Sequence, residues 1–282
     1  MTRTISHSPA IPLVARAPAP VVIKLGGRAL EAPGAGTELA ASLVQLAAAG
    51  SRAVLVHGGG RELSDWCRRL GHEPRFDAGL RVTDPATLEV AAAVLGGLAN
   101  ARLVASLRAG GLDAAGLSAA DGGLIAAAPH PEAARLGHVG IACGANPRLL
   151  ELLLAAGVTP VVSSIGAHSG ALLNLNGDEV AGALAAALRA RALIVLSDVA
   201  GVMLEGRLVP RLHGDELATV LAREDVRDGM IPKLQSAGRA LAGGAASVII
   251  GAWRGPDSLA ALLAGHAAAT VILPSRPEVA HA

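Results

Sequence analysis

Lysine is scarce in this 282-residue chain, and both lysines lie where a bound anion would need a positive charge. Of the 24 Lys and Arg residues, 22 are Arg, which leaves only Lys24 and Lys233. Lys24 precedes a Gly-Gly pair, and Lys233 lies early in a predicted helix, where a cation is unfavourable unless an anion is bound nearby. Both could be remnants of a compositional drift toward Ala, Gly, Arg and Pro. We favour a requirement for a compact ammonium that the larger guanidinium cannot replace.

Two glycine clusters could offer backbone N–H groups to the same anion. KLGG at residues 24–27 and HGGG at residues 57–60 each follow a short apolar run that predicts a strand. In an open parallel sheet, ligands bind beyond the carboxyl ends of the strands, and glycine lets the backbone approach a phosphate closely. With 35 glycines in the chain, either cluster could instead be an ordinary tight turn. Neither matches the Walker GxxxxGK[ST] pattern or the dinucleotide-binding GxGxxG pattern.

The HGGG cluster also occurs in the oxyanion hole of some α/β-hydrolases. That interpretation needs a GxSxG nucleophile elbow, which the chain lacks, and Ser169 in GAHSG is out of register. No acidic partner for His57 is evident from the sequence. We therefore disfavour a hydrolase and interpret His57 as a residue at the end of a strand rather than a general base.

Three polar side chains alternate at a predicted helix start, at Asn174, Asn176 and Asp178. Asn and Asp are good N-caps, but one helix needs one cap. Two of the four Asn residues of the whole chain lie here. We therefore favour a functional role for the group over capping alone.

Arg81 in GLRVTD lies in a loop before another predicted helix, which Thr83 or Asp84 could cap without it. A fixed guanidinium suits a carboxylate, which it can bind through two hydrogen bonds; an ordinary solvated arginine is the alternative. The segment SDVAGVM at residues 197–203 follows a predicted strand. Its backbone groups could hold a nucleotide base or ribose.

Composition bounds the kind of protein. The chain is 52% hydrophobic and 17% charged, with a net charge of +1, so it can bury one large or two small cores. That composition excludes a disordered chain and disfavours a nucleic-acid-binding protein, which usually has a strong basic excess. The two cysteines, Cys67 and Cys143, are far apart in the sequence, which predicts no zinc site or disulfide framework and fits a reduced cytoplasm.

The order of predicted elements favours an α/β fold. Short apolar runs alternate with helical patterns, which predicts a mainly parallel sheet covered on both faces. We expect two lobes with a boundary near residues 165–190. The main predicted strands are 21–25, 53–56, 158–163, 192–196 and 247–250, with short strands in 114–143, and the predicted helices are 37–49, 61–70, 85–109, 147–156, 176–190, 214–223 and 232–242.

Neither the N-terminal segment nor the longest uncharged stretch predicts a membrane anchor. Apolar runs in residues 1–20 are short and broken by four prolines, which predicts a disordered tail rather than a signal peptide. The longest uncharged stretch, residues 152–177, is interrupted by three glycines and a proline and makes a poor membrane span. We expect a soluble, cytoplasmic protein.

Taken in order, these segments resemble the acetylglutamate kinases of the amino acid kinase family, from about residue 20 to the C-terminus. Each motif alone is weak, but eight in register are specific. The matching segments are VVIKLGG (21–27), VHGGG (56–60), GLRVTD (79–84), LGHVG (136–140), PVVSSIG (160–166), NLNGD (174–178), LSDVAGV (196–202) and DGMIPK (228–233).

The resemblance implies a three-layer α/β/α sandwich with a mainly parallel central sheet. It implies an N-lobe (21–175) for acyl-amino-acid binding and dimerisation and a C-lobe (176–282) for ATP, after the tail of residues 1–20. The implied reaction is phosphorylation of the side-chain carboxylate of N-acetyl-L-glutamate by MgATP in arginine biosynthesis, with Mg²⁺ held mainly by the ATP phosphates.

The resemblance also implies roles for residues already singled out. Lys24 resembles the lysine that contacts the transferring phosphoryl group, Lys233 the lysine on the leaving side, and Asp178 the aspartate that orients both. The implied binding residues are Gly59, Gly60, Arg81 and Asn174 for the acyl-amino acid, and Gly26, Gly27, Gly58, Asp198, Val199, Ala200, Gly201, Val202 and Met203 for ATP and its phosphates. A carboxylate nucleophile with a pKa near 4.3 is already ionised at pH 7, so no general base is expected.

Some features depart from the family's pattern or leave alternatives open. Position 28 is Arg where the family often has Asn, Ser or a small residue, and position 177 is Gly where Ala is common. One alternative is a kinase of carrier-linked aminoadipate in lysine biosynthesis, which the uninterrupted GLRVTD disfavours. Another is a catalytically dead amino-acid sensor, which the intact Lys24, Asp178 and Lys233 disfavour.

The N-terminal segment bears on assembly. Family members that arginine inhibits usually carry a long N-terminal helix that links dimers into hexamers. Here four prolines precede residue 21, and they should prevent a continuous helix. We therefore predict a homodimer without strong arginine inhibition, and no nucleic-acid or membrane partner.

Overall fold

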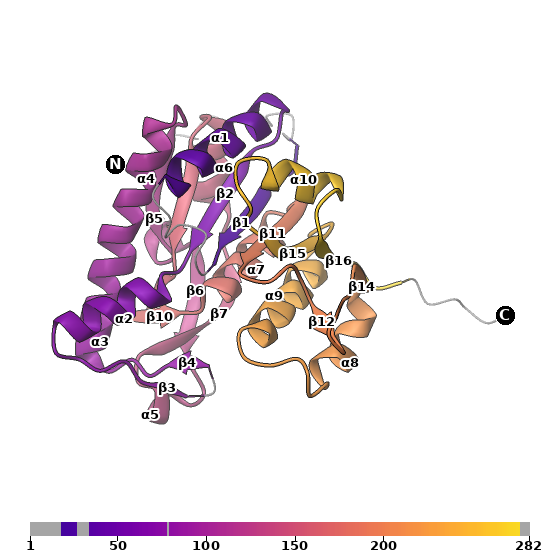
Figure 1. The fold of residues 1–282 in the computed structure, drawn as a ribbon. Helices are drawn as coiled ribbons and strands as arrows, with labels where there is room; N and C mark the ends of the chain where they lie inside the picture. Colours follow the sequence, from indigo (N-terminus) through magenta and orange to yellow (C-terminus); the bar gives the residue numbers. More distant parts are fainter. Residues whose placement is uncertain (1–17, 27–33, 78, 277–282) are drawn as a thin grey trace, which may run out of the picture.

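The computed structural model describes residues 18–26, 34–77 and 79–276. Its central feature is an eight-stranded sheet with the order β14-β16-β15-β11-β1-β2-β8-β5 (Figure 1). All neighbouring strands in it are parallel except β15 and β16. The strands are β1 (Val21–Leu25), β2 (Ala53–His57), β5 (Ala114–Ser118), β8 (Thr159–Ser163), β11 (Ala192–Ser197), β14 (Arg211–His213), β15 (Val248–Ala252) and β16 (Ala269–Leu273).

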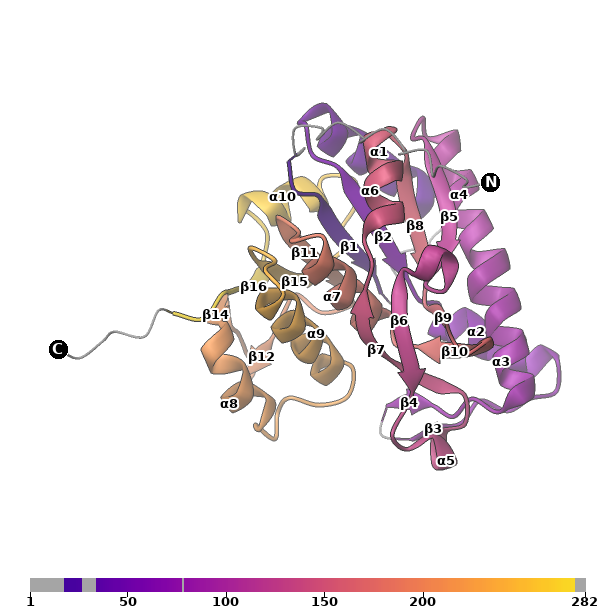
Figure 2. The same ribbon diagram turned by 180° about the vertical axis from the view of Figure 1, so that it is seen from behind.

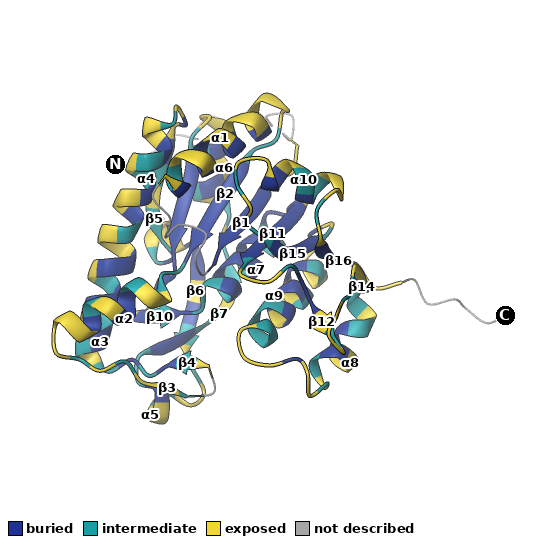
Figure 3. Ribbon diagram, viewed as in Figure 1, coloured by how far each residue is buried: buried dark blue, intermediate teal, exposed yellow. Residues whose placement is uncertain are grey.

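Helices cover both faces of this sheet, which confirms the predicted three-layer α/β/α sandwich. One face carries α1 (Ala35–Ala48), α4 (Asn100–Ala109) and α10 (Ser258–Ala264), seen in front in Figure 1. The other carries α6 (Arg148–Ala155), α7 (Gly177–Ala187) and α9 (Met230–Ala242), seen in front in Figure 2. Because both faces are covered, all five residues of β1 are buried, and Figure 3 shows the inner strands in the colour of buried residues.

A second sheet, which the sequence analysis did not resolve, packs beside the first with the order β6-β7-β10-β9. Its strands β9 (Ile165–His168) and β10 (Ala171–Leu175) form a hairpin where a lobe boundary was expected. Asn174 therefore lies in a strand rather than at a helix start. The other two strands are β6 (Ile125–Pro129) and β7 (Val139–Ala145).

The smaller elements surround the carboxyl ends of the central strands. The helix predicted at 214–223 is a 3₁₀ turn, Gly214–Glu216, followed by the short α8 (Leu217–Leu221). The remaining elements are α2 (Gly60–Arg69), β3 (Phe76–Asp77), β4 (Leu80–Arg81), α3 (Pro85–Ala91), the 3₁₀ turn Asp121–Gly123, α5 (Ala133–Leu136), β12 (Met203–Leu204) and β13 (Arg207–Leu208).

Within the described residues, one helix is long and apolar enough to cross a membrane by length and composition. The predicted helix at 85–109 is confirmed: α3 and α4 are joined by the π-helical segment Ala92–Ala99 into 25 continuous residues. Length and composition alone are weak evidence for a span, since core helices of soluble proteins pass the same test. Leu103 and Leu107 of this helix are buried in the core against the central sheet.

Candidate active site

The carboxyl ends of β1 and β2 bring the two glycine clusters together. Lys24 of β1 pairs in register with Val56 of β2 on one side and Val195 of β11 on the other. A Cβ placed on Gly177, at the start of α7, would lie 3.6 Å from both the Gly58 nitrogen and Lys24 Cε. Segments more than 100 residues apart in the sequence therefore meet at one point, as expected for strand ends in a parallel sheet.

A buried carboxylate lies between the two lysines. Lys24 Nζ is 3.1 Å from Asp178 Oδ1, and Lys233 Nζ is 3.9 Å from Asp178 Oδ2. Asp178 is 5% exposed and lies in the first turn of α7, whose positive N-terminal end favours a carboxylate. The capping role falls to Asn176, whose side chain accepts a hydrogen bond from the Asp178 N–H at 2.8 Å. Of the alternating polar residues, Asn176 therefore caps α7, and the carboxylate of Asp178 is free to pair with the two lysines.

Lys233 is held less firmly than Lys24. It lies early in α9, as predicted, at the fourth position of a helix that begins two residues before the predicted start, and its ammonium donates a 2.9 Å hydrogen bond to the Gly229 carbonyl one turn earlier. Burial lowers the pKa of Lys233, and the neighbouring charge of Lys24 lowers it further, while Asp178 opposes both. An additional anion bound nearby would stabilise the charged form of Lys233 and raise its pKa again.

Arg81 is buried beside the glycine cluster with part of its guanidinium free. One nitrogen, Nη2, donates to the Gly60 carbonyl and to Ser64 Oγ, both at 2.7 Å, whereas Nη1 is buried with no hydrogen-bond partner in the described part of the chain. The guanidinium carbon lies 4.6 Å from the ring centroid of Phe76, and burial lowers the pKa of Arg81. A buried N–H donor without a partner is costly, so this site is built to receive an acceptor.

Asn174 lies across the same cavity. Its Nδ2 donates to Thr83 Oγ1 at 3.1 Å, and Thr83 is fully buried. A cavity of about 220 Å³ collects eight of the predicted site residues: Lys24, Gly26, Gly58, Gly59, Gly60, Arg81, Asn174 and Asp178.

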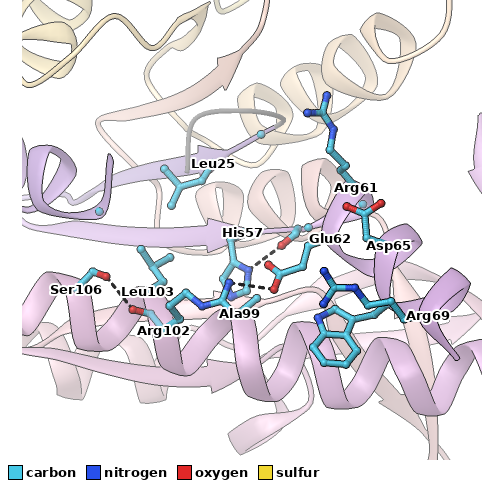
Figure 4. A pocket seen from close by; sticks show the side chains of 16 residues that line it. Leu25, His57, Arg61, Glu62, Asp65, Arg69, Ala99, Arg102, Leu103 and Ser106 are labelled. Atoms are coloured by element: carbon cyan, nitrogen blue, oxygen red, sulfur yellow. Dashed lines mark hydrogen bonds and ion pairs between the residues drawn. The ribbon is translucent and has the colours of Figure 1, made fainter. Parts of the chain in front are cut away.

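The HGGG cluster ends in the N-terminus of α2 with no side-chain cap. Gly59, the N-cap, has φ 153°, and a Cβ there would lie 2.7 Å from Leu95 Cδ2, so this position requires glycine. Uncapped N–H groups at a helix start bind anions. A larger cavity of about 800 Å³ also borders Gly58, Gly59 and Gly60, together with Trp66. His57 lines the same cavity (Figure 4).

The segment predicted to hold the nucleotide has two kinds of residue. Gly201 and Val202 are buried, and the Val202 N–H donates to Thr270 Oγ1 at 2.8 Å, so that N–H is committed within the protein. Val199 and Met203 are 42% and 40% exposed, and Asp198 is exposed near enough to Lys233 to raise its pKa. Ala200 is half-buried. Gly27 and Arg28 lie outside the described residues.

The sequence of this chain is similar to known kinases over most of its length. Residues 19–252 match the model of the Amino acid kinase family. The acetylglutamate kinase of Symbiobacterium thermophilum is 41% identical over 251 residues, covering 85% of this chain and 86% of that protein. The acetylglutamate kinase of Methanopyrus kandleri is 42% identical over 239 residues, covering 81% and 93%. The chain belongs to the amino acid kinase family.

Solved structures share the fold of this family member. N-acetylglutamate synthase from Neisseria gonorrhoeae, complexed with coenzyme A and N-acetyl-glutamate, superposes with a TM-score of 0.78 at 25% identity, covering 92% of this chain and 60% of that one. Carbamate kinase from Giardia gives 0.66 at 15% identity, covering 92% and 100%. At 15% identity, the similarity to carbamate kinase shows only a shared fold, which is the mixed sheet between two helical layers.

Two site residues escaped the sequence analysis. Ser64 accepts a hydrogen bond from Arg81, and Phe76 packs on the guanidinium face. Ser64 lies one helical turn after Gly60, so a search along the face of the predicted helix next to the glycines could have found it. Phe76 is the only Phe in the chain and lies five residues before Arg81, a spacing that shows proximity only once the β3–β4 hairpin is known.

Proposed function

We propose that this kinase transfers the γ-phosphoryl group of ATP to the side-chain carboxylate of N-acetyl-L-glutamate, in arginine biosynthesis. The observation that carries the proposal is Asp178 between Lys24 and Lys233, at the edge of a cavity that Arg81 also lines. The names of relatives with about 40% identity support the same substrate.

The proposed chemistry depends on charge and position. The substrate carboxylate is ionised at neutral pH and needs no general base. The difficulty is the approach of one anion to the polyanionic triphosphate, which positive charge and fixed geometry overcome. In the proposal Lys24 stabilises the transferring phosphoryl group, Lys233 stabilises the charge on the leaving side, and Asp178 holds both ammonium groups in place.

The remaining residues bind the two substrates. Arg81 Nη1, which lacks a partner, is proposed to donate to the α-carboxylate of acetylglutamate. Asn174 is proposed to contact the acetamido group, and Gly59 and Gly60 to bind the substrate with their N–H groups. ATP is proposed to lie against Gly26, Gly27, Gly58 and the segment Asp198–Met203.

Mg²⁺ is proposed to enter with ATP. Among the described residues, no three His, Cys, Asp or Glu side chains gather as a metal site, and Asp178 is engaged by the lysines. The ATP phosphates suit Mg²⁺, which usually binds through one or two carboxylates together with substrate phosphates. The ion would neutralise phosphate charge, and the lysines would neutralise what remains.

The proposal also assigns one substrate to each lobe and an oligomeric state to the protein. Residues 21–175 would bind the acyl-amino acid and form the dimer, and residues 176–282 would bind ATP. We expect a cytoplasmic homodimer, without nucleic-acid or membrane partners, and without strong inhibition by arginine. A hexamer on a sizing column would contradict the homodimer, and inhibition by submillimolar arginine would contradict the expected lack of arginine control.

A coupled kinase assay tests the proposal. We expect ADP release that depends on acetylglutamate, and hydroxylamine should trap the acyl phosphate as a hydroxamate. The matched substrate is acetylaminoadipate, one methylene longer, and the control enzyme is Lys24→Ala. Greater kcat/KM on acetylaminoadipate would favour the lysine-biosynthesis alternative, and no turnover with either substrate would favour the sensor.

A further inference from the structure

His57 at the end of β2 is buried, and its two ring nitrogens have different partners. His57 is 2% exposed. Its Nδ1 lies 2.8 Å from the Gly58 carbonyl oxygen, and its Nε2 lies 3.0 Å from Asn100 Nδ2 of α4. Figure 4 shows the His57 side chain beside the larger cavity, with its hydrogen bond to the adjacent backbone.

The orientation of the Asn100 amide follows from its other neighbours. Its Nδ2 is 2.9 Å from the Val161 carbonyl oxygen and 3.4 Å from that of Leu117. Carbonyl oxygens only accept hydrogen bonds, so the amide nitrogen rather than Oδ1 must face them. The other N–H of that nitrogen is then available to His57 Nε2. Asn100 is therefore a donor toward the histidine.

The state of the histidine follows in turn. Since Nε2 accepts from Asn100, the ring proton lies on Nδ1 and is donated to the Gly58 carbonyl. Burial is the largest influence on the pKa of His57 and lowers it, in agreement with a neutral ring. The sequence also makes room for this arrangement, because a Cβ on Gly116 of β5 would collide with Asn100 Oδ1.

This hydrogen bond fixes a peptide that lines the proposed phosphoryl-transfer site. In a trans peptide the N–H of Gly59 points opposite to the carbonyl of Gly58, so it is directed away from His57. Glycine peptides turn over readily because no Cβ restricts them, and a defined donor selects one orientation. Gly59 and Lys24 line the same cavity. We propose that His57, held as its Nδ1-protonated tautomer by Asn100, is a positioning residue that keeps the Gly59 N–H directed into that cavity, at the end of the substrate that receives the phosphoryl group.

The inference rests on the proposed function, and paired substitutions test it. His57→Asn places an amide donor near the position of Nδ1, whereas His57→Leu removes the donor. We expect His57→Leu to lower kcat about 10²-fold, the effect of losing one oriented N–H donor, with the KM for acetylglutamate within about threefold of wild type. His57→Asn should restore kcat to within about fivefold of wild type. A folded His57→Leu enzyme with near-normal kcat, or a His57→Asn enzyme no better than His57→Leu, overturns the proposal.

A double-mutant cycle separates positioning from general support of the fold. Asn100→Leu keeps the size of the side chain and removes its hydrogen bonds. If Asn100 acts through the histidine, Asn100→Leu should lower kcat about tenfold in the wild type and much less in the His57→Asn background. An equal loss of kcat in both backgrounds would contradict the proposal that Asn100 acts through His57.

A spectroscopic measurement is independent of turnover. Long-range ¹H–¹⁵N spectra of the wild-type imidazoles, assigned by the signal that His57→Asn removes, should show Nδ1 protonated and Nε2 as an acceptor. A ring protonated on Nε2, or on both nitrogens, overturns the proposal even if the variants do not fold. If wild type fails to phosphorylate acetylglutamate, the proposed function falls, and the tautomer still decides the state of His57.

Discussion

The two lysines of the site are held in different ways. Lys24 lies in a strand paired on both sides, with an ion-pair distance of 3.1 Å to Asp178. Lys233 lies in the first turns of a helix, 3.9 Å from the same carboxylate and hydrogen-bonded to a turn carbonyl. We infer that the side of the site around Lys24, proposed to bind the acyl-amino acid, is formed before ligands bind. On the side proposed to bind the nucleotide, we infer that Lys233 releases the Gly229 carbonyl when a phosphate replaces it.

The largest expected effect is on the side that is already formed. Lys24→Ala should lower kcat by about 10² to 10³, because it removes a fixed charge at the transferring group and leaves Asp178 without its nearer partner. Steady-state kinetics with both substrates saturating measures this loss. Lys24→Arg is the matched control for charge, and we expect it to fail as well because the larger fork misplaces the charge. Turnover near wild type in Lys24→Ala would remove Lys24 from its proposed role, and turnover near wild type in Lys24→Arg would show that either cation serves at this position.

Lys233→Ala should cost about 10² in kcat, a transition-state loss of about 2.7 kcal/mol. In the proposed role, the charged form of Lys233 stabilises the transition state, and burial holds the pKa of Lys233 below the ordinary 10.5. Activity should therefore fall as the pH rises through that lowered pKa. In Lys233→Arg the alkaline decline should disappear, because a guanidinium stays protonated, although kcat is lower throughout. An identical alkaline limb in Lys233→Arg would assign the decline to another group.

The same shift has a consequence for stability. Lys233 binds its proton less tightly in the folded state than in the unfolded state. The resulting penalty is fully present below the folded-state pKa and is relieved as the pH rises from there toward 10.5. Urea unfolding across that window should show a smaller alkaline loss of stability in wild type than in Lys233→Met. A larger loss in wild type would reverse the sign of the shift.

On the nucleotide side, Gly201→Ala should act on stability and on ATP binding together. A Cβ there would lie 2.5 Å from Thr270 Oγ1 and 2.8 Å from the Thr270 nitrogen, and Thr270 is fully buried. We expect a loss of about 1 to 3 kcal/mol in the free energy of unfolding. A shift in the adjacent loop worth about 1 kcal/mol would raise the KM for ATP about fivefold. An equal rise in the KM for acetylglutamate would mean that the two sides are not separate.

The central strands and the charged site residues could be predicted from the sequence, whereas the partners of those residues could not. Buried parallel strands are continuous apolar runs, so β1, β2, β8 and β11 were predicted nearly to the residue. Lys24 stood out because lysine is scarce in this chain, and Asp178 and Arg81 stood out because capping of the predicted helices did not require them. The β9–β10 hairpin was missed because its strands alternate weakly and a lobe boundary fitted the same residues. The partners of Arg81 and His57, which are Ser64, Phe76 and Asn100, depend on tertiary contacts that no local pattern encodes.

The smallest expected effect lies where the two sides meet, at Gly177. A Cβ there would make ordinary van der Waals contacts at 3.6 Å with Lys24 Cε and the Gly58 nitrogen. Gly177→Ala should therefore raise the free energy of unfolding by about 0.4 to 1 kcal/mol, because alanine lowers the conformational entropy of the unfolded chain. We expect kcat within about twofold of wild type. Gly182→Ala in the same helix is the matched control and should destabilise, since its Cβ would lie 2.9 Å from the Ser236 carbonyl oxygen. A large loss of kcat in Gly177→Ala would show that Lys24 needs more freedom than its paired strand and ion pair suggest.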